Sequence, residues 1–121
     1  MKLATGVDLV EIARIEEVVA RHGKRYLERV FTPAELDYCG KRTESLAGRF
    51  AAKEAVAKAL GSGIGDVTWQ EIEILGDELH APRLILHGAA ESRAKELGLT
   101  TWSVSISHSL SHSVALVVAL G

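Results

Sequence analysis

The chain has little cysteine and no long apolar run, and each absence excludes a class of protein. Cys39 is the only cysteine among the 121 residues, so an internal disulfide is impossible and the sequence is compatible with a reducing compartment. No apolar run approaches the roughly 20 residues that a transmembrane helix needs. Asp8 and Glu11 interrupt the apolar N-terminus before the core of a secretory signal peptide could form. We therefore expect a cytoplasmic protein with no membrane partner.

An excess of one charge sign is also missing, with 14 lysines and arginines against 16 aspartates and glutamates. The net charge of −2 at pH 7 and the pI near 6.2 argue against general binding of nucleic acid. The composition, 47% hydrophobic and 25% charged, is that of an ordinary globular protein. Because the chain has no repeat, linker or room for a second core, we expect a single domain over residues 1–121.

Apolar periodicity and turn residues predict an α+β domain, with helices packed on a small, mostly antiparallel sheet. Thr32, Pro33 and Glu35 have the pattern of a capping box and predict the start of a helix. The run 114–120 is apolar on both faces and is predicted to form the buried centre of a sheet. The expected strands are 3–12, 71–75, 83–87, 100–107 and 113–120, and the other expected helices are 14–22, 25–30, 44–60 and 88–97.

Glu54 is a carboxylate on an otherwise small or apolar helical stripe. The segment 44–60 is rich in Ala, Leu, Lys and Glu and lacks proline, which predicts a helix. Steps of three and four residues lead from Ala47 through Phe50 to Glu54, so this side chain is expected to face the core. An unpaired buried carboxylate is very costly, and Lys58, four residues later, is one candidate partner.

Asp8 is a second carboxylate that we expect on an inward face. It alternates with Gly6 and Val10 on one face of the first strand, and the glycine leaves room for another group to approach. Two inward carboxylates repel each other unless a cation lies between them, and Mg²⁺ held by one or two carboxylates typically also binds a substrate phosphate. The residues alone leave two interpretations open: a shared metal site, or separate ion pairs in which Lys58 binds Glu54.

His108 ends a strictly alternating strand, on the face of Val104 and Ile106, while serines including Ser107 occupy the other face. This rim position suits a ligand contact, although a structural histidine bonded to a backbone carbonyl is the simpler interpretation of the local pattern. The glycine cluster 61–65 follows a helix instead of preceding one. It therefore predicts a helix C-terminus and a loop close to which a ligand can pass, not a phosphate-binding loop.

A local positive patch follows the first strand. Arg14, Arg21 and Arg25 are spaced seven and four residues apart, so they align if helical geometry persists through Gly23. Such a patch is often only a solvated face. If it recruits a partner, an acidic protein fits better than nucleic acid, because no aromatic residues interleave with the charges.

Four motifs together resemble those of the holo-[acyl-carrier-protein] synthases, the small bacterial 4′-phosphopantetheinyl transferases. They follow one another in the family's order and spacing across nearly the whole chain. The motifs are Gly-Val-Asp at 6–8, Phe-Thr-Pro-Ala-Glu-Leu at 31–36, Arg-Phe-Ala-Ala-Lys-Glu-Ala at 49–55 with Lys58, and Ser-Ile-Ser-His-Ser at 105–109. The resemblance implies the 4′-phosphopantetheinyl transferase fold and a homotrimer with active sites between subunits.

The resemblance also implies an activity that supports fatty acid biosynthesis. Members transfer 4′-phosphopantetheine from coenzyme A to a serine of apo acyl carrier protein, which gives the holo protein and adenosine 3′,5′-bisphosphate. Asp8 and Glu54 match the Mg²⁺ ligands, and with Lys58 they are the expected catalytic residues. The base that deprotonates the serine is left open among Glu54, a metal-bound water and a partner carboxylate. The expected coenzyme A contacts are Arg49, Lys58, Gly63, Gly65, Pro82, Ser107 and His108, and the expected carrier-protein contacts are Arg14, Arg21 and Arg25.

One hairpin departs from the resemblance. Family members usually read Asn-Gly-x-Pro before the Ala-rich helix, whereas residues 78–82 read Glu-Leu-His-Ala-Pro, so only Pro82 is assigned a coenzyme A contact there. Two other function classes stay under consideration. One is a different Mg²⁺-dependent enzyme such as a nucleotide pyrophosphohydrolase, which usually carries more clustered acidic ligands. The other is a non-catalytic trimeric binding module in which Asp8 and Glu54 are only paired charges.

Overall fold

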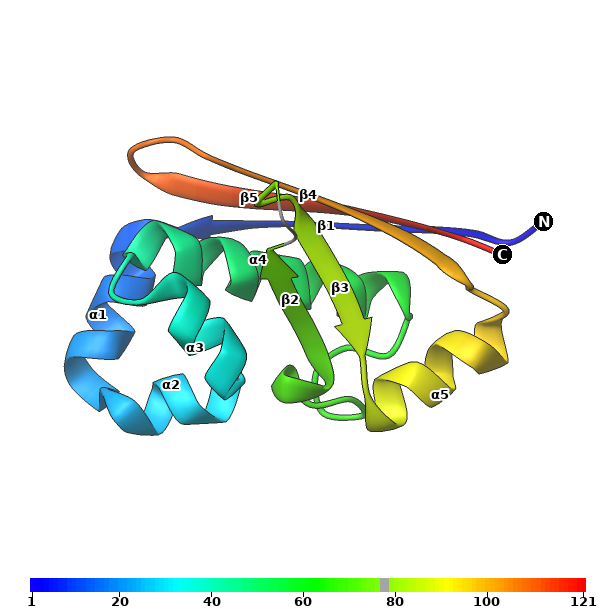
Figure 1. Ribbon diagram of the computed structural model, residues 1–121, viewed down its shortest axis with the longest axis horizontal. Coiled ribbons are helices and arrows are strands. Elements are labelled where there is room, and N and C mark those ends of the chain that lie inside the picture. The colour runs from blue at the N-terminus through cyan, green and yellow to red at the C-terminus, as the bar shows by residue number, and fades with distance from the viewer. Residues whose placement is uncertain (77–78) are drawn as a thin grey trace.

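Figure 1 shows the computed structural model, which describes residues 1–76 and 79–121. The α+β class is confirmed, but the strands form two antiparallel sheets instead of one: β1-β5-β4, and the hairpin β2-β3. The strands are β1 (Leu3–Glu11), β2 (Ile72–Gly76), β3 (Pro82–Leu86), β4 (Thr101–His108) and β5 (His112–Leu120). The helices are α1 (Ile12–His22), α2 (Lys24–Val30), α3 (Pro33–Cys39), α4 (Thr43–Ala59) and α5 (Gly88–Leu97), with a 3₁₀ turn, η1, at Trp69–Glu71.

Helix α4 lies along one face of the three-stranded sheet, with α1–α3 at one end and α5 at the other (Figure 1). A Cβ atom built on Gly6 would lie 1.8 Å from the carbonyl oxygen of Ala55, so only glycine allows β1 and α4 to approach this closely. The group that approaches Gly6 is therefore the helix backbone itself. This contact sets Asp8, two residues along β1, beside the C-terminal half of α4.

The C-terminal strand is the centre of its sheet, as predicted, but only one of its faces is buried. Ala115, Val117 and Ala119 face α4 and are fully buried. On the opposite face Leu116 is 48% exposed and Leu120 is 40% exposed, so the prediction of burial on both faces is wrong for the single chain. The neighbouring β1 adds further exposed apolar side chains to this outer face, namely Leu3, Val7 and Leu9.

The first two helices do not form one continuous helix. Gly23 has φ 52° and ψ −131°, which ends α1 and starts α2 in a new direction. The alignment of Arg14, Arg21 and Arg25 that depended on continuous geometry is therefore wrong. Strand β1 ends at Glu11 and α1 begins at the next residue, so the strand is one residue shorter and the helix two residues longer than expected.

The predicted start of α3 and the predicted end of α4 are both confirmed. Thr32 and Glu35 form the predicted capping box. After α4 the amides of Gly61, Ser62 and Gly63 bond to its last carbonyls, which is the predicted helix C-terminus. The hairpin is also confirmed, although residues 77 and 78, where its predicted turn begins, lie outside the described residues. No helix within the described ranges is both long and apolar enough to cross a membrane.

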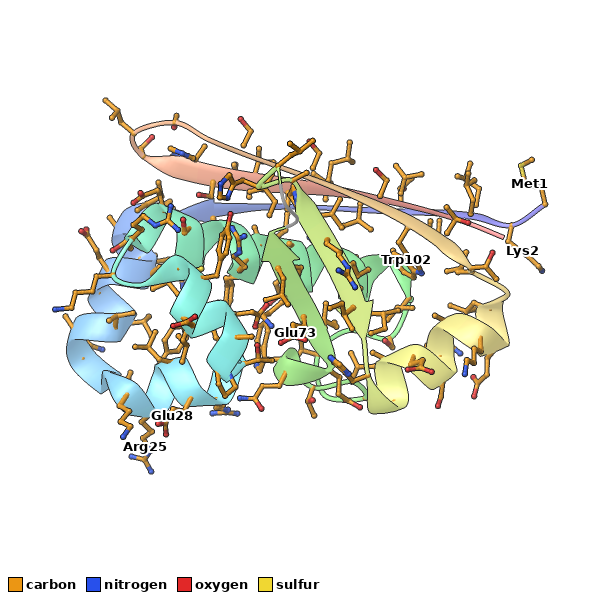
Figure 2. All side chains as sticks on the ribbon, in the orientation of Figure 1. Met1, Lys2, Arg25, Glu28, Glu73 and Trp102 are labelled. Carbon is orange, nitrogen blue, oxygen red and sulfur yellow. The ribbon has the colours of Figure 1, made fainter. Side chains whose placement is uncertain are left out.

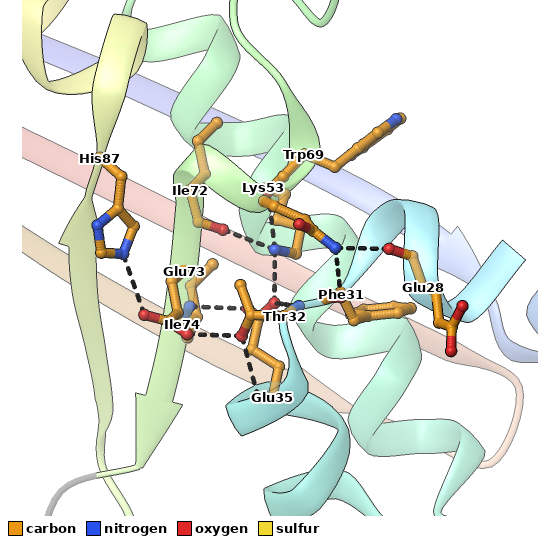
Figure 3. Close-up of polar contacts among 11 residues, drawn as sticks. Glu28, Phe31, Thr32, Glu35, Lys53, Trp69, Ile72, Glu73, Ile74 and His87 are labelled. Carbon is orange, nitrogen blue, oxygen red and sulfur yellow. Dashed lines mark hydrogen bonds and ion pairs between the residues drawn. The ribbon is translucent and has the colours of Figure 1, made fainter. Parts of the chain in front are cut away.

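A fully buried ion pair, unforeseen from the sequence, anchors α4. Lys53 Nζ donates to Glu35 Oε1 at 2.7 Å and to the backbone carbonyls of Trp69 and Ile72 at 2.9 and 2.6 Å (Figure 3). The second carboxylate oxygen of Glu35 accepts the amide of Ile74 at 2.8 Å. Burial lowers the pKa of Lys53 and the Glu35 carboxylate opposes that shift. The pair joins α3, α4, η1 and β2, and so fixes the helix that also carries Glu54.

Candidate active site

The structure brings Asp8 and Glu54 to one cavity of about 460 Å³, between β1, α1 and α4. Lys58 Nζ lies 3.2 Å from Asp8 Oδ1 and 2.9 Å from the carbonyl oxygen of Val7. Lys58 is therefore bonded to Asp8 across 50 residues of sequence, and the pairing considered between Glu54 and Lys58 is not the one that forms. The reason is that the Gly6 contact seats the Asp8 carboxylate against the last turn of α4.

Glu54 is half-buried in this cavity instead of facing the hydrophobic core. Burial raises the pKa of its carboxyl group, the nearby Asp8 carboxylate raises it further, and Lys58 acts in the opposite direction. Three carboxylates, those of Asp8, Glu11 and Glu54, line the cavity together with the cationic Arg14, and Lys58 is bonded to Asp8. An additional cation would relieve the repulsion between the carboxylates, which is the arrangement expected of a divalent-metal site.

The donor set fits Mg²⁺ bound together with a phosphate group, because this ion is usually held by one or two carboxylates and by substrate oxygens. Across residues 1–76 and 79–121 there is no cluster of three or more His, Cys, Asp or Glu side chains able to hold a metal ion. A fully protein-ligated metal centre therefore does not fit the described residues. Asp8 and Glu54 leave most of the coordination positions to a ligand and to water.

Tyr26 and His112 are among the residues of this cavity that were not expected from the sequence. The Tyr26 hydroxyl is buried with no hydrogen-bond partner in the described structure, and burial raises its pKa to about 12. His112 pairs in register with Glu11 at the end of β1. Neither was visible as a site residue, because one lies on a short helix and the other begins the apolar strand β5.

A second, smaller cavity of about 190 Å³ gathers three of the residues expected at coenzyme A: Arg49, Pro82 and His108. Arg49 comes from α4 and is only 7% exposed. Its guanidinium lies over the Tyr38 ring, 4.6 Å from the centroid, while its buried Nε has no hydrogen-bond partner among the described residues. A buried guanidinium with a free donor is suited to bind an anion. Ser107 lines a neighbouring hollow together with His108.

The two expected loop glycines lie elsewhere. Gly63 and Gly65 are exposed, with φ of 68° and 129°, in the segment that follows α4. Neither glycine is among the described residues that line the cavity of Glu54 or the cavity of Arg49. They follow Lys58 in sequence.

The three arginines expected to dock a carrier protein occupy different surroundings. Arg14 lines the cavity of Asp8 and Glu54. Arg21 forms an exposed ion pair with Glu17 at 3.6 Å. Arg25 projects from α2 on the side away from the three-stranded sheet (Figure 2). The patch is therefore spread over two helices, with only Arg14 at the carboxylate site.

Comparison with known proteins bears directly on this site. The family model of the 4′-phosphopantetheinyl transferase superfamily matches residues 4–117. The chain belongs to this superfamily. The match covers all four motifs and both cavities. The resemblance drawn from the sequence is thereby confirmed.

Individual relatives in the superfamily agree closely along the whole chain. A holo-[acyl-carrier-protein] synthase from Herpetosiphon aurantiacus is 52% identical over 126 residues, covering 98% of this chain and 99% of the relative. The crystal structure of the Helicobacter pylori synthase in complex with coenzyme A has a TM-score of 0.88 at 37% identity, covering 96% of this chain and 99% of that one. The Bacillus anthracis synthase in complex with CoA (3′,5′-ADP) has a TM-score of 0.80 at 36% identity, with coverage of 98% and 97%.

Proposed function

We propose that the chain transfers 4′-phosphopantetheine from coenzyme A to a serine of apo acyl carrier protein, releasing adenosine 3′,5′-bisphosphate. One observation carries the proposal: Asp8 and Glu54 share a cavity beside Lys58, in a chain of the 4′-phosphopantetheinyl transferase superfamily. The full chain, 1–121, acts as a single transferase domain in the cytoplasm. Its product, holo acyl carrier protein, supports fatty acid biosynthesis.

The reaction is a displacement at phosphorus. The serine oxygen forms a bond to the phosphorus that bears pantetheine, the serine proton leaves, and the bond to the oxygen of adenosine 3′,5′-bisphosphate breaks. Asp8 and Glu54 would hold Mg²⁺, which would supply positive charge to offset the charge that develops during phosphoryl transfer. Lys58 offers a further cation beside Asp8, because its side chain is 54% exposed and its ammonium group is bonded to the Asp8 carboxylate. Charge compensation is what this reaction type chiefly requires of a protein.

The cavity around Arg49 is proposed to hold the nucleotide end of coenzyme A. The guanidinium and His108 supply donors to phosphate oxygens, and Pro82 and Ser107 line the two hollows on either side of His108. Gly63 and Gly65 leave space for the ligand near Lys58, since a Cβ at either position would meet nothing within 4 Å. Arg14 at the carboxylate cavity, with Arg21 and Arg25, is proposed to attract an acidic carrier protein.

The exposed face of the three-stranded sheet supports a homotrimer. Leu3, Val7 and Leu9 on β1 are 66%, 53% and 64% exposed, and Leu116 and Leu120 on β5 lie beside them. A contiguous apolar face of this kind usually marks a protein interface. We propose that copies of the chain cover it, with the coenzyme A site lying between subunits. Size-exclusion chromatography with light scattering tests this: wild type should have three times the mass of the chain, and Leu116→Glu should shift it to monomer.

A mass-spectrometric assay separates the proposed activity from its rivals. The protein is incubated with coenzyme A, Mg²⁺ and apo acyl carrier protein, and the carrier protein is weighed. The transfer proposal requires the phosphopantetheine adduct together with adenosine 3′,5′-bisphosphate. Cleavage of coenzyme A that needs no carrier protein would indicate a pyrophosphohydrolase, and an unchanged mixture would indicate a binding module. Either result would overturn the proposal.

A further inference from the structure

His80 has a backbone conformation that side chains disfavour. Its φ of 62° is in the left-handed region, and it is the only non-glycine residue within 1–76 and 79–121 with a positive φ. The Cβ of an ordinary residue crowds the following carbonyl in this conformation, although histidine tolerates it better than most residues. Backbone outliers of this kind cluster at active sites and at segments that clamp a ligand.

The imidazole of His80 is held by Tyr38. The Tyr38 hydroxyl lies 3.3 Å from His80 Nδ1, and the ring centroids are 6.3 Å apart. The same tyrosine ring lies against the guanidinium of Arg49 at 4.6 Å. Tyr38 is itself fixed, because Gly76 leaves the space that its ring fills: a Cβ on Gly76 would lie 2.6 Å from the ring. A rigid aromatic residue thus connects His80 to the buried arginine.

His80 also lines the cavity of Arg49, as does His108. Two imidazoles and a guanidinium therefore surround one small space, and one donor of the guanidinium, Nε, has no partner in the described structure. Glu44 is the carboxylate that lines the same cavity. When the Tyr38 hydroxyl donates to Nδ1, the proton of the neutral imidazole is on Nε2, which can then donate to a ligand. A small cavity rich in donors selects a phosphate group with several free oxygens.

We propose that His80 is a specificity-determining residue of the subsite that holds the nucleotide end of coenzyme A. Oriented by Tyr38, its imidazole donates from Nε2 to the 3′-phosphate of coenzyme A. This inference rests on the proposed function, because it assigns the ligand of the Arg49 cavity as the nucleotide end of the donor substrate. It adds a residue from the hairpin whose sequence departs from the family pattern. The chemistry of the reacting phosphorus, at Asp8 and Glu54, is left unchanged.

Isothermal titration with coenzyme A and with 3′-dephospho-coenzyme A tests the assignment. His80→Gly suits the left-handed backbone and removes only the imidazole, so the protein should unfold at the same or a higher temperature than wild type. Its Kd for coenzyme A should rise about tenfold to a hundredfold, as expected for the loss of one hydrogen bond to a charged group. Its Kd for the dephospho compound should change by less than about twofold.

Further variants separate positioning from bulk structure. Tyr38→Phe keeps the ring and removes the hydroxyl, so it should weaken coenzyme A binding in the same direction but by less, and adding it to His80→Gly should cost nothing more. His80→Asn, which also tolerates a positive φ, should behave like the glycine variant. His22→Asn, at an exposed histidine of α1, is the matched control and should bind both ligands as wild type does. In turnover, His80→Gly should raise KM for coenzyme A and leave kcat unchanged.

Two results would overturn the inference. One is an unchanged Kd for coenzyme A in both folded His80 variants. The other is an equal loss for coenzyme A and its dephospho form, which would place His80 away from that phosphate. These outcomes differ from failure of the proposed function, in which wild-type protein itself would neither bind coenzyme A nor modify apo carrier protein.

Discussion

Replacing Lys53 with methionine should destabilise the fold more than any change at an exposed lysine. Lys53 and Glu35 are both completely buried, and the 2.7 Å bond between them lies at the centre of the network in Figure 3. In Lys53→Met the Glu35 carboxylate keeps the amides of Thr32 and Ile74 but loses the ammonium group bonded to it. Breaking one partner of a buried ion pair typically costs about 3–5 kcal/mol.

The magnitude should be near the upper part of this range for a second reason. The carbonyl oxygens of Trp69 and Ile72, at 2.9 and 2.6 Å from Nζ, lose their lysine donor at the same time. The Trp69 carbonyl keeps the amide of Ile72 as a donor. A buried acceptor left without a partner, as at Ile72, adds about 1–3 kcal/mol, which the apolar burial of methionine only partly offsets. For a chain of this size the loss should lower the melting temperature by roughly 10–20 °C.

Urea unfolding followed by circular dichroism, at one fixed protein concentration, measures the effect. Lys95→Met is the matched control: Lys95 forms a 3.0 Å pair with Glu91 but is 75% exposed, so its loss should cost at most about 1 kcal/mol. Glu35→Gln in the Lys53→Met background removes the unpaired buried charge and should recover part of the loss. A cost for Lys53→Met no larger than that of the surface control would refute the reasoning.

Three further predictions concern Glu54, Gly6 and Cys39. Burial and Asp8 raise the pKa of Glu54 above its ordinary value of 4.5, so the folded state binds more protons and stability is lost as pH rises from that value through the folded pKa. Glu54→Gln should therefore stabilise the metal-free protein at about pH 7 but not at about pH 4 in urea titrations, and equal effects at both would contradict the shift. Gly6→Ala should lower the melting temperature and abolish transfer, because its Cβ overlaps the Ala55 carbonyl at 1.8 Å; near-native unfolding and turnover would show that β1 and α4 can separate freely. Cys39 is fully buried and burial raises the pKa of its thiol, so a thiol reagent should modify it only at the rate of unfolding, and fast labelling of the native protein would be inconsistent with its position.

Local patterns in the sequence were sufficient for most of the fold. Thr32, Pro33 and Glu35 carry a complete helix-start signal within four residues, and the run 114–120 is so apolar that it had to be central in a sheet. The exposed outer face of β5 was not predictable in the same way. A strand that is apolar on both sides looks alike whether its second face meets a helix or another chain.

The ion pairs of Lys53 and Lys58 could not be predicted from local sequence patterns, because the two partners of each pair are distant in sequence. Lys53 appears in the Ala-rich helix as an ordinary surface lysine, and its partner Glu35 lies 18 residues away on another helix. Lys58 is four residues from Glu54, which made that pair attractive, yet the close β1–α4 contact at Gly6 gives it Asp8 instead. The positive φ of His80 depends on how its hairpin closes, which composition does not reveal.

The central claim is that Asp8 and Glu54 together form one metal and phosphate site that carries out the transfer. Its most direct test compares single-turnover rates of phosphopantetheine transfer for Asp8→Asn, Glu54→Gln and the double variant, at saturating coenzyme A and Mg²⁺. Asp37→Asn, at an exposed carboxylate of α3, is the control and should match wild type. We predict that each single variant folds as wild type does and loses at least about 100-fold in rate, and that the double variant is hardly slower than either, because both residues act as one unit. A near-wild-type rate in either single variant, or losses that multiply in the double variant, would contradict a shared site.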